Sequence, residues 1–86
     1  MPPYALRFSK RVEKELGALP LEIRERLVRA AESLPVDPRP SGCKKIVGEE
    51  RAYRIRVGNY RMVYEVHDGE LVILVVRAGH RRDVYR

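Results

Sequence analysis

Apolar residues recur at helical spacing along the N-terminal part of the chain. Ahead of them, residues 4–8 alternate between large apolar side chains and smaller or charged ones, which predicts a short strand. Ser9 is a residue type that caps helices, and the apolar stripe after it predicts a helix over residues 10–18. Pro20 separates this helix from a second one, predicted over residues 21–34. We therefore expect a strand followed by a helical hairpin.

The C-terminal part of the chain alternates with the period of strands. Residues 53–57 and 60–67 are predicted strands, and Gly58-Asn59 between them is a two-residue hairpin signal. Asp68-Gly69 is a second such signal. Residues 71–76 form a nearly continuous apolar run, which predicts a central strand covered on both faces. The pattern therefore predicts an antiparallel three-strand meander.

The remaining segments connect these elements. Residues 35–42 hold three prolines and a glycine, which predicts an extended connector. Residues 44–47 are expected to form a short edge strand or to lead into the sheet, and Gly79 is expected to end the last strand. A chain of this length makes one domain, over residues 1–86, with a thin core.

The predicted fold is α+β, with a helix pair on one face of a small sheet and the other face partly open. Alternation within the strands divides their side chains between these two faces. The residues expected to face the helices are Ile55, Met62, Tyr64 and Val66. The residues expected on the open face are Arg54, Arg56 and Arg61.

Charge follows the same division of the chain. Residues 51–86 carry eight arginines and four acidic side chains, a net of +4. Residues 1–50 carry ten basic and eight acidic side chains, a net of +2. The total of +6 favours nucleic acid or an acidic protein as partner. A membrane surface is a less favoured partner, because no predicted helix carries a wide apolar face opposite a basic one.

The single cysteine excludes an intramolecular disulfide and a cysteine-based metal cluster, so Cys43 is expected to be reduced and incidental. No apolar run is long enough for a signal peptide or a membrane span, and the expected location is the cytoplasm. No cofactor is expected.

Two segments resemble RelE-type toxins, and the resemblance extends over nearly the whole chain. Residues 52–66, which read AYRIRVGNYRMVYEV, are similar to the central hairpin of that family. Residues 78–85, which read AGHRRDVY, are similar to its ending. The segments around Phe8-Ser9-Lys10 and Lys44-Lys45-Ile46-Val47-Gly48 fit the same pattern. Both main segments together make the resemblance specific, whereas either alone would be weak.

The resemblance implies a compact ribonuclease-like toxin of a type II toxin–antitoxin pair, which cleaves mRNA codons in the ribosomal A site without a metal. The catalytic positions of the family fall on Arg54, Arg56, Arg61, Arg81 and Tyr85, with His80 at a position that is often histidine. The positions expected to bind RNA or the ribosome are Lys44, Lys45, Arg51 and Arg82. The implied partners are the ribosome, mRNA and a small acidic RelB-like antitoxin.

Cleavage by attack of a 2′-OH needs stabilisation of phosphate charge and groups that move protons. Arginine can clamp a phosphate but is a poor proton shuttle, so we expect His80 or Tyr85 to take that role. The arginines could also form only a solvated face, and Tyr85 could cap the core. His67 is expected to be structural. The alternative functions are inhibition of DNA gyrase, as in ParE-like relatives, and RNA binding without catalysis.

Overall fold

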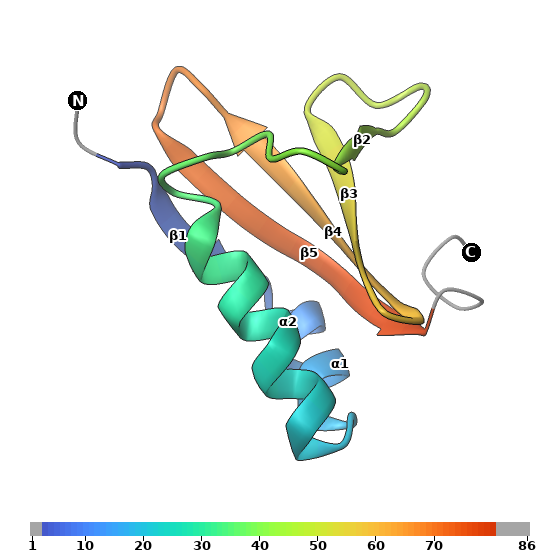
Figure 1. Ribbon diagram of the computed structural model, residues 1–86. Coiled ribbons are helices and arrows are strands. Elements are labelled where there is room, and N and C mark those ends of the chain that lie inside the picture. Colours follow the sequence, from blue (N-terminus) through green and yellow to red (C-terminus); the bar gives the residue numbers. More distant parts are fainter. Residues whose placement is uncertain (1–2, 81–86) are drawn as a thin grey trace.

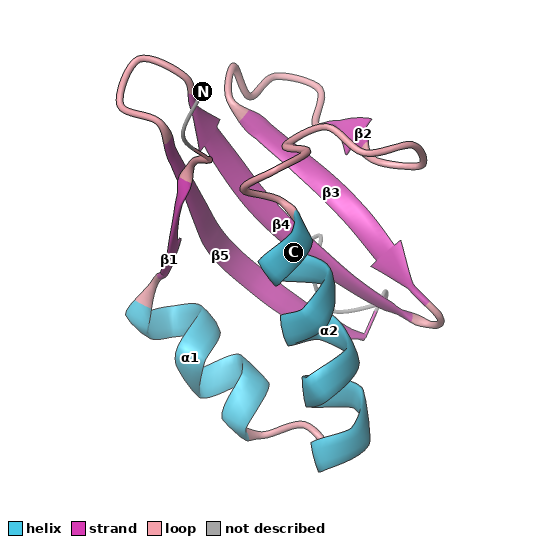
Figure 2. Cartoon of the chain, turned by 60° about the vertical axis from the view of Figure 1, so that its left-hand side comes forward, coloured by secondary structure: helices cyan, strands magenta, loops and turns pink. Residues whose placement is uncertain are grey.

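The computed structural model describes residues 3–80 of the chain. Its elements are β1 (Ala5–Phe8), α1 (Lys10–Gly17), α2 (Leu21–Ser33), β2 (Lys44–Lys45), β3 (Ala52–Val57), β4 (Tyr60–His67) and β5 (Val72–His80). The strands form one mixed sheet in the order β1-β5-β4-β3-β2 (Figure 1). Both helices lie on the same face of this sheet (Figure 2). The α+β fold predicted from the sequence is confirmed.

The two helices form where the apolar stripes predict them. The Ser9 hydroxyl accepts a hydrogen bond from the backbone N–H of Val12 at 3.1 Å, so the predicted N-cap of α1 is confirmed. α2 begins after Pro20, without a side-chain cap. No helix within residues 3–80 is long and apolar enough to cross a membrane.

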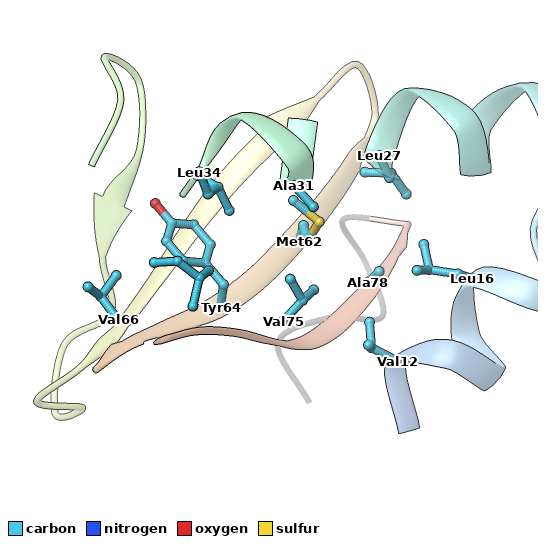
Figure 3. Packing of buried hydrophobic residues seen from close by; sticks show 11 residues of the cluster. Val12, Leu16, Leu27, Ala31, Leu34, Met62, Tyr64, Val66, Val75 and Ala78 are labelled. Atoms are coloured by element: carbon cyan, nitrogen blue, oxygen red, sulfur yellow. The ribbon is translucent and has the colours of Figure 1, made fainter. Parts of the chain in front are cut away.

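The core lies between the helices and the sheet (Figure 3). Its largest fully buried side chains include Leu27 and Leu34 from the helical hairpin and Met62 and Tyr64 from β4. The Tyr64 hydroxyl donates a hydrogen bond to the carbonyl oxygen of Pro38 at 2.8 Å. Burial raises the pKa of Tyr64 above its ordinary value, because the charged form would lose its hydration. This bond ties the connector between α2 and β2 to the centre of the sheet.

The partner of the first strand could not be predicted from the sequence. β1 pairs in parallel with β5, with Ala5 opposite Val72 and Phe8 opposite Val75. β5 therefore lies inside the sheet, between β1 and β4. This pairing places the first and the last strand of the described chain side by side, and it makes the sheet mixed.

The Gly58-Asn59 hairpin forms as predicted, with Val57 opposite Tyr60. The short edge strand expected within residues 44–47 forms as β2, over Lys44–Lys45. Two other details differ from the prediction. His67 pairs with Val72, so the second turn spans residues 68–71 instead of two residues. β5 continues through Gly79 to His80, because both residues still pair with β4.

The expectation that the last strand is covered on both faces was also wrong. Along β5, Ile73, Val75 and Ala78 are buried, while Leu74 and Val76 remain half-exposed. Helices cover one face of the sheet only, so the alternate residues of this interior strand face its partly open side.

Candidate nucleic-acid interface

The open face carries a group of cations at the end of the sheet near the β3–β4 turn. In the strand register Lys44 lies opposite Arg54, and Arg56 lies opposite Arg61. Opposed residues of adjacent strands share a face, so these four side chains form one group, which we call the basic cluster. The strand register thus confirms the prediction that Arg54, Arg56 and Arg61 share one face of the sheet.

Like charges directly across two strands disfavour folding, by about 0.2–1 kcal/mol for a pair. The opposition of Arg56 to Arg61 therefore does not serve the stability of the sheet. Neither Lys44 nor Arg56 forms an ion pair with a carboxylate of residues 3–80, whereas Arg54 and Arg61 have further interactions. Such an arrangement is suited to binding an anion.

A pocket of about 150 Å³ lies among these cations. Its lining residues are Gly42, Lys44, Arg54, Ile55, Arg56 and Arg61. The volume is well below the roughly 300–1,000 Å³ of sites that enclose a drug-sized ligand. A single phosphate group of a longer polymer fits this size and charge better than a whole small molecule does.

Backbone geometry directs one of these arginines. The Nε atom of Arg56 donates a hydrogen bond to the carbonyl oxygen of Gly58 at 2.9 Å. Gly58 has φ +61°, a left-handed conformation that glycine adopts without the usual steric cost. The tight turn therefore both sets the register of the hairpin and orients the Arg56 guanidinium.

The structure separates the two adjacent lysines. Lys45 lies opposite Tyr53, on the face away from Lys44. Its ammonium donates a hydrogen bond to the Glu49 carbonyl oxygen at 2.9 Å and also to that of Glu50. It lies 5.5 Å from the centre of the Tyr53 ring. Lys45 thus closes the loop between β2 and β3, and only Lys44 joins the basic cluster.

Arg51 also lies apart from the basic cluster. It lines a separate depression together with the acidic residues Glu49, Glu50 and Glu65. His67 lies in the same region, with its Nε2 atom 2.8 Å from a carboxylate oxygen of Glu65. The open face is therefore basic toward the β3–β4 turn and acidic near the β4–β5 turn.

His80 lies on the opposite face from the basic cluster. It pairs with Tyr60, and the two rings meet edge to face with centroids 5.6 Å apart. Tyr60 packs against the core, so this is the face that the helices cover. The reason is a bulge between Val63 and Tyr64, where β5 contributes one extra residue. Without it, His80 would fall on the face of Arg61, since one residue of shift exchanges the faces.

The predicted site residues Arg81, Arg82 and Tyr85 lie outside the described residues. Sequence reasoning overlooked a contact that holds the strand leading to them. The carboxylate of Glu15 in α1 accepts hydrogen bonds from the Nε atom of Arg77 at 3.0 Å and from the Ala78 N–H at 2.9 Å. Glu15 thereby takes the place of a neighbouring strand beyond the end of β1. Glu15 and Arg77 are 62 positions apart in the sequence, and no local pattern predicts a contact between them.

A second polar network holds the connector that leads to Lys44. Asp68 accepts a hydrogen bond from the Tyr4 hydroxyl at 2.6 Å and one from Arg39 at 2.8 Å. Arg39 also donates to the Tyr53 hydroxyl at 3.0 Å and lies over its ring. The hydrogen bond from Tyr4, and to a smaller extent the one from Arg39, keeps the pKa of Asp68 below its ordinary value. The network joins the connector to Tyr4, just before β1, and to the β4–β5 turn.

The architecture and the basic cluster can be compared with known proteins. Residues 6–85 match the family model described as the ParE toxin of the type II toxin–antitoxin system parDE. The chain belongs to the RelE/ParE family of type II toxins. The resemblance noted in the hairpin and the ending is thereby confirmed.

Individual toxins of this family are similar along nearly their full length. Toxin RelG of Mycobacterium tuberculosis is 30% identical over 98% of this chain and 98% of its own. The mRNA interferase toxin RelE of Escherichia coli K12 is 32% identical over 91% of this chain and 83% of its own. Toxin RelE3 of Methanocaldococcus jannaschii is 38% identical over 91% of each.

Solved structures of family toxins share the fold. The toxin in the RelBE2 toxin–antitoxin complex of M. tuberculosis superposes with a TM-score of 0.80 and 28% identity, over 92% of this chain and 99% of that one. In the intact E. coli RelBE toxin–antitoxin complex the TM-score is 0.79 and the identity 32%, over 90% of this chain and 95% of that one. Both structures contain the toxin bound to an antitoxin.

Proposed function

We propose that this toxin is a ribosome-dependent mRNA endonuclease, which cleaves codons in the A site by attack of a 2′-OH on the adjacent phosphodiester. The observation that carries the proposal is the basic cluster, where Arg56 and Arg61 face each other across two strands. Support also comes from the relative in E. coli, which is named an mRNA interferase. In this function the cost of opposing like charges is offset by binding of the scissile phosphate.

The proposed division of labour follows from side-chain chemistry. Arg61 and Arg56 stabilise the charge that develops on the phosphate oxygens, and Arg54 and Lys44 hold the RNA backbone. Attack of the 2′ oxygen forms a bond to phosphorus and breaks the bond from phosphorus to the 5′ oxygen, so a proton must leave the 2′-OH and another must reach the departing 5′ oxygen. Guanidinium groups remain protonated, so these proton transfers fall to another group. The candidates are His80 and Tyr85, with Arg81 adding charge stabilisation. No step of this scheme uses a metal ion.

Within this proposal, the register places His80 on the face away from the basic cluster. The imidazole must leave its contact with Tyr60 before it can approach a phosphate on the open face. Tyr85→Phe tests the alternative, because it removes only the hydroxyl. A large loss of cleavage would mean that Tyr85 handles protons, whereas a small one would leave it a stacking role on a codon base. Lys45, Arg51 and Arg82 are proposed only as contacts to ribosomal RNA.

The proposed partner is a small acidic antitoxin of the RelB kind. The toxins of the two solved complexes above are bound to antitoxins, and this chain carries a net charge of +6. A partly disordered acidic segment could fold on the toxin and neutralise the open face. Co-expression with the product of an adjacent small gene should yield a complex whose association slows as salt rises. Failure of such products to bind would contradict the proposal.

A second candidate function is inhibition of DNA gyrase, which the ParE description of the matched family model favours. Primer extension on mRNA from cells that express the toxin alone distinguishes the two. A nuclease produces new 5′ ends in phase with codons and leaves DNA supercoiling normal. A gyrase inhibitor changes supercoiling and leaves mRNA intact. Binding to RNA without either effect would support a non-catalytic role instead.

A further inference from the structure

The β3–β4 turn has a second arginine beside it, which comes from the helical layer. The guanidinium of Arg26 in α2 lies against Gly58, with Nη2 3.6 Å and Nη1 3.8 Å from where a Cβ on that glycine would stand. Arg56 donates to the carbonyl oxygen of the same glycine. Guanidinium groups from the sheet and from α2 therefore meet at one residue of the turn.

The local sequence of α2 would place Arg26 elsewhere. Glu22 precedes it by four residues, which is the favourable spacing for an ion pair along a helix. Yet no carboxylate of residues 3–80 lies within ion-pair distance of Arg26. Its guanidinium lies instead against Gly58, exposed to solvent, and Arg56 binds the carbonyl oxygen of the same glycine. Two cations at one glycine, neither of them in an ion pair with a carboxylate of residues 3–80, are suited to binding an anion.

We propose that Arg26 is a further RNA-binding residue, which holds a backbone phosphate next to the one bound in the basic cluster. This inference rests on the proposed action on RNA. The positive surface continues from Arg61 and Arg56 on the open face, around Gly58, to Arg26 on the helical side. A polymer with a charge on every unit can contact both sides of the turn at once, and each contact releases a counterion. Arg26 thus contributes binding and register and takes no part in the chemistry.

The test measures RNA binding and cleavage separately. The full chain is titrated with a single-stranded RNA oligonucleotide carrying 2′-O-methyl groups, which cannot undergo 2′-OH attack, over a range of salt concentrations. Arg26→Gln should bind about twofold to fivefold more weakly at 0.1 M salt and reduce the slope of log affinity against log salt by about 0.7. Arg26→Lys keeps the charge and should keep the slope.

Arg7→Gln is the matched control, because Arg7 is also exposed but lies on β1 at the opposite edge of the sheet. It should change neither affinity nor slope. On programmed ribosomes, Arg26→Gln should raise KM and leave kcat unchanged, as expected for a contact made equally in the ground and transition states. Thermal melting should match the wild type, since the substitution is exposed.

Several outcomes would overturn the inference. One is a wild-type salt slope in Arg26→Gln, and another is an equal loss in Arg7→Gln, which would mean a general effect of net charge. A third is weaker binding to an acidic antitoxin with unchanged RNA binding, which would assign this surface to a protein partner. If the wild type binds the oligonucleotide but does not cleave mRNA, the nuclease proposal fails while the role of Arg26 in binding stands.

Discussion

Replacing Arg56 by glutamine should reduce activity strongly and stability hardly at all. Its opposition to Arg61 costs the fold about 0.2–1 kcal/mol. Its hydrogen bond to the Gly58 carbonyl oxygen stabilises the fold by a similar amount, about 0.5–1.5 kcal/mol. The lower end of this range applies where water competes for the bond. The two contributions nearly cancel, so we expect the free energy of unfolding of Arg56→Gln to stay within about 0.5 kcal/mol of the wild type. That corresponds to less than about 4 °C in Tm.

A change in salt concentration distinguishes the charge repulsion of Arg56 from its hydrogen bond. Raising the salt from about 0.1 M to 1 M shortens the screening length from about 10 Å to 3 Å, which weakens the repulsion between Arg56 and Arg61. The wild type should therefore gain stability relative to Arg56→Gln, by about 0.2–1 kcal/mol in urea unfolding. Arg7→Gln should follow the wild type, because Arg7 lies opposite Leu74 and not opposite a cation.

Single-turnover cleavage on programmed ribosomes completes this test. Removing a guanidinium that stabilises the transition state should lower the cleavage rate by a factor of about 10²–10³. Loss of more than about 1.5 kcal/mol of stability in Arg56→Gln would show that the residue serves the fold, and the argument from like charges would fail. Retained stability together with unchanged cleavage would remove Arg56 from the proposed site.

Three further outcomes are expected. Arg61→Ala should lose about 10²–10³ in the rate of single-turnover cleavage; a loss below about tenfold would contradict charge stabilisation by this residue. His80→Gln should flatten the pH–rate profile between about pH 6 and 8 if the imidazole moves a proton, and an unchanged profile would exclude that role. Asp68→Asn should lower stability at pH 7, measured by urea unfolding. The pKa of Asp68 is lowered in the folded state, so its contribution is present above its unfolded pKa of about 3.9 and is lost as the pH falls through the folded value. Wild type and variant should therefore converge in acid, and an equal difference at both pH values would contradict the role of the charge.

Much of the candidate site followed from local rules in the sequence. Strand alternation places Arg54 and Arg56 on one face, and the two-residue turn at Gly58-Asn59 sets Arg61 opposite Arg56. The helical stripes and the cap at Ser9 could be predicted for the same reason. Each of these features depends on residues only a few positions apart, whose backbone preferences act before any tertiary contact forms.

Tertiary structure determined which other residues join the site. A single bulge in β4–β5 pairing transfers His80 to the helix-covered face, and no local preference signals where that extra residue is inserted. The same holds for Lys44, which joins the arginines only because β2 pairs with β3 in one register and not the next. Arg26 reaches the turn because α2 packs across the sheet, although its own helix offers Glu22 as a partner.

The parallel pairing of β1 with β5 is the clearest case of this kind, because it joins residues 67 positions apart. Local sequence determines the periodicity and the ends of each element, since those depend on nearby steric and hydrogen-bonding preferences. Register between distant elements depends on how all the apolar faces are buried together and on where unpaired backbone groups find partners. The sequence by itself therefore determined a basic hairpin on an α+β fold. Only the packed structure placed Lys44 and Arg26 beside this hairpin and His80 on the helix-covered face.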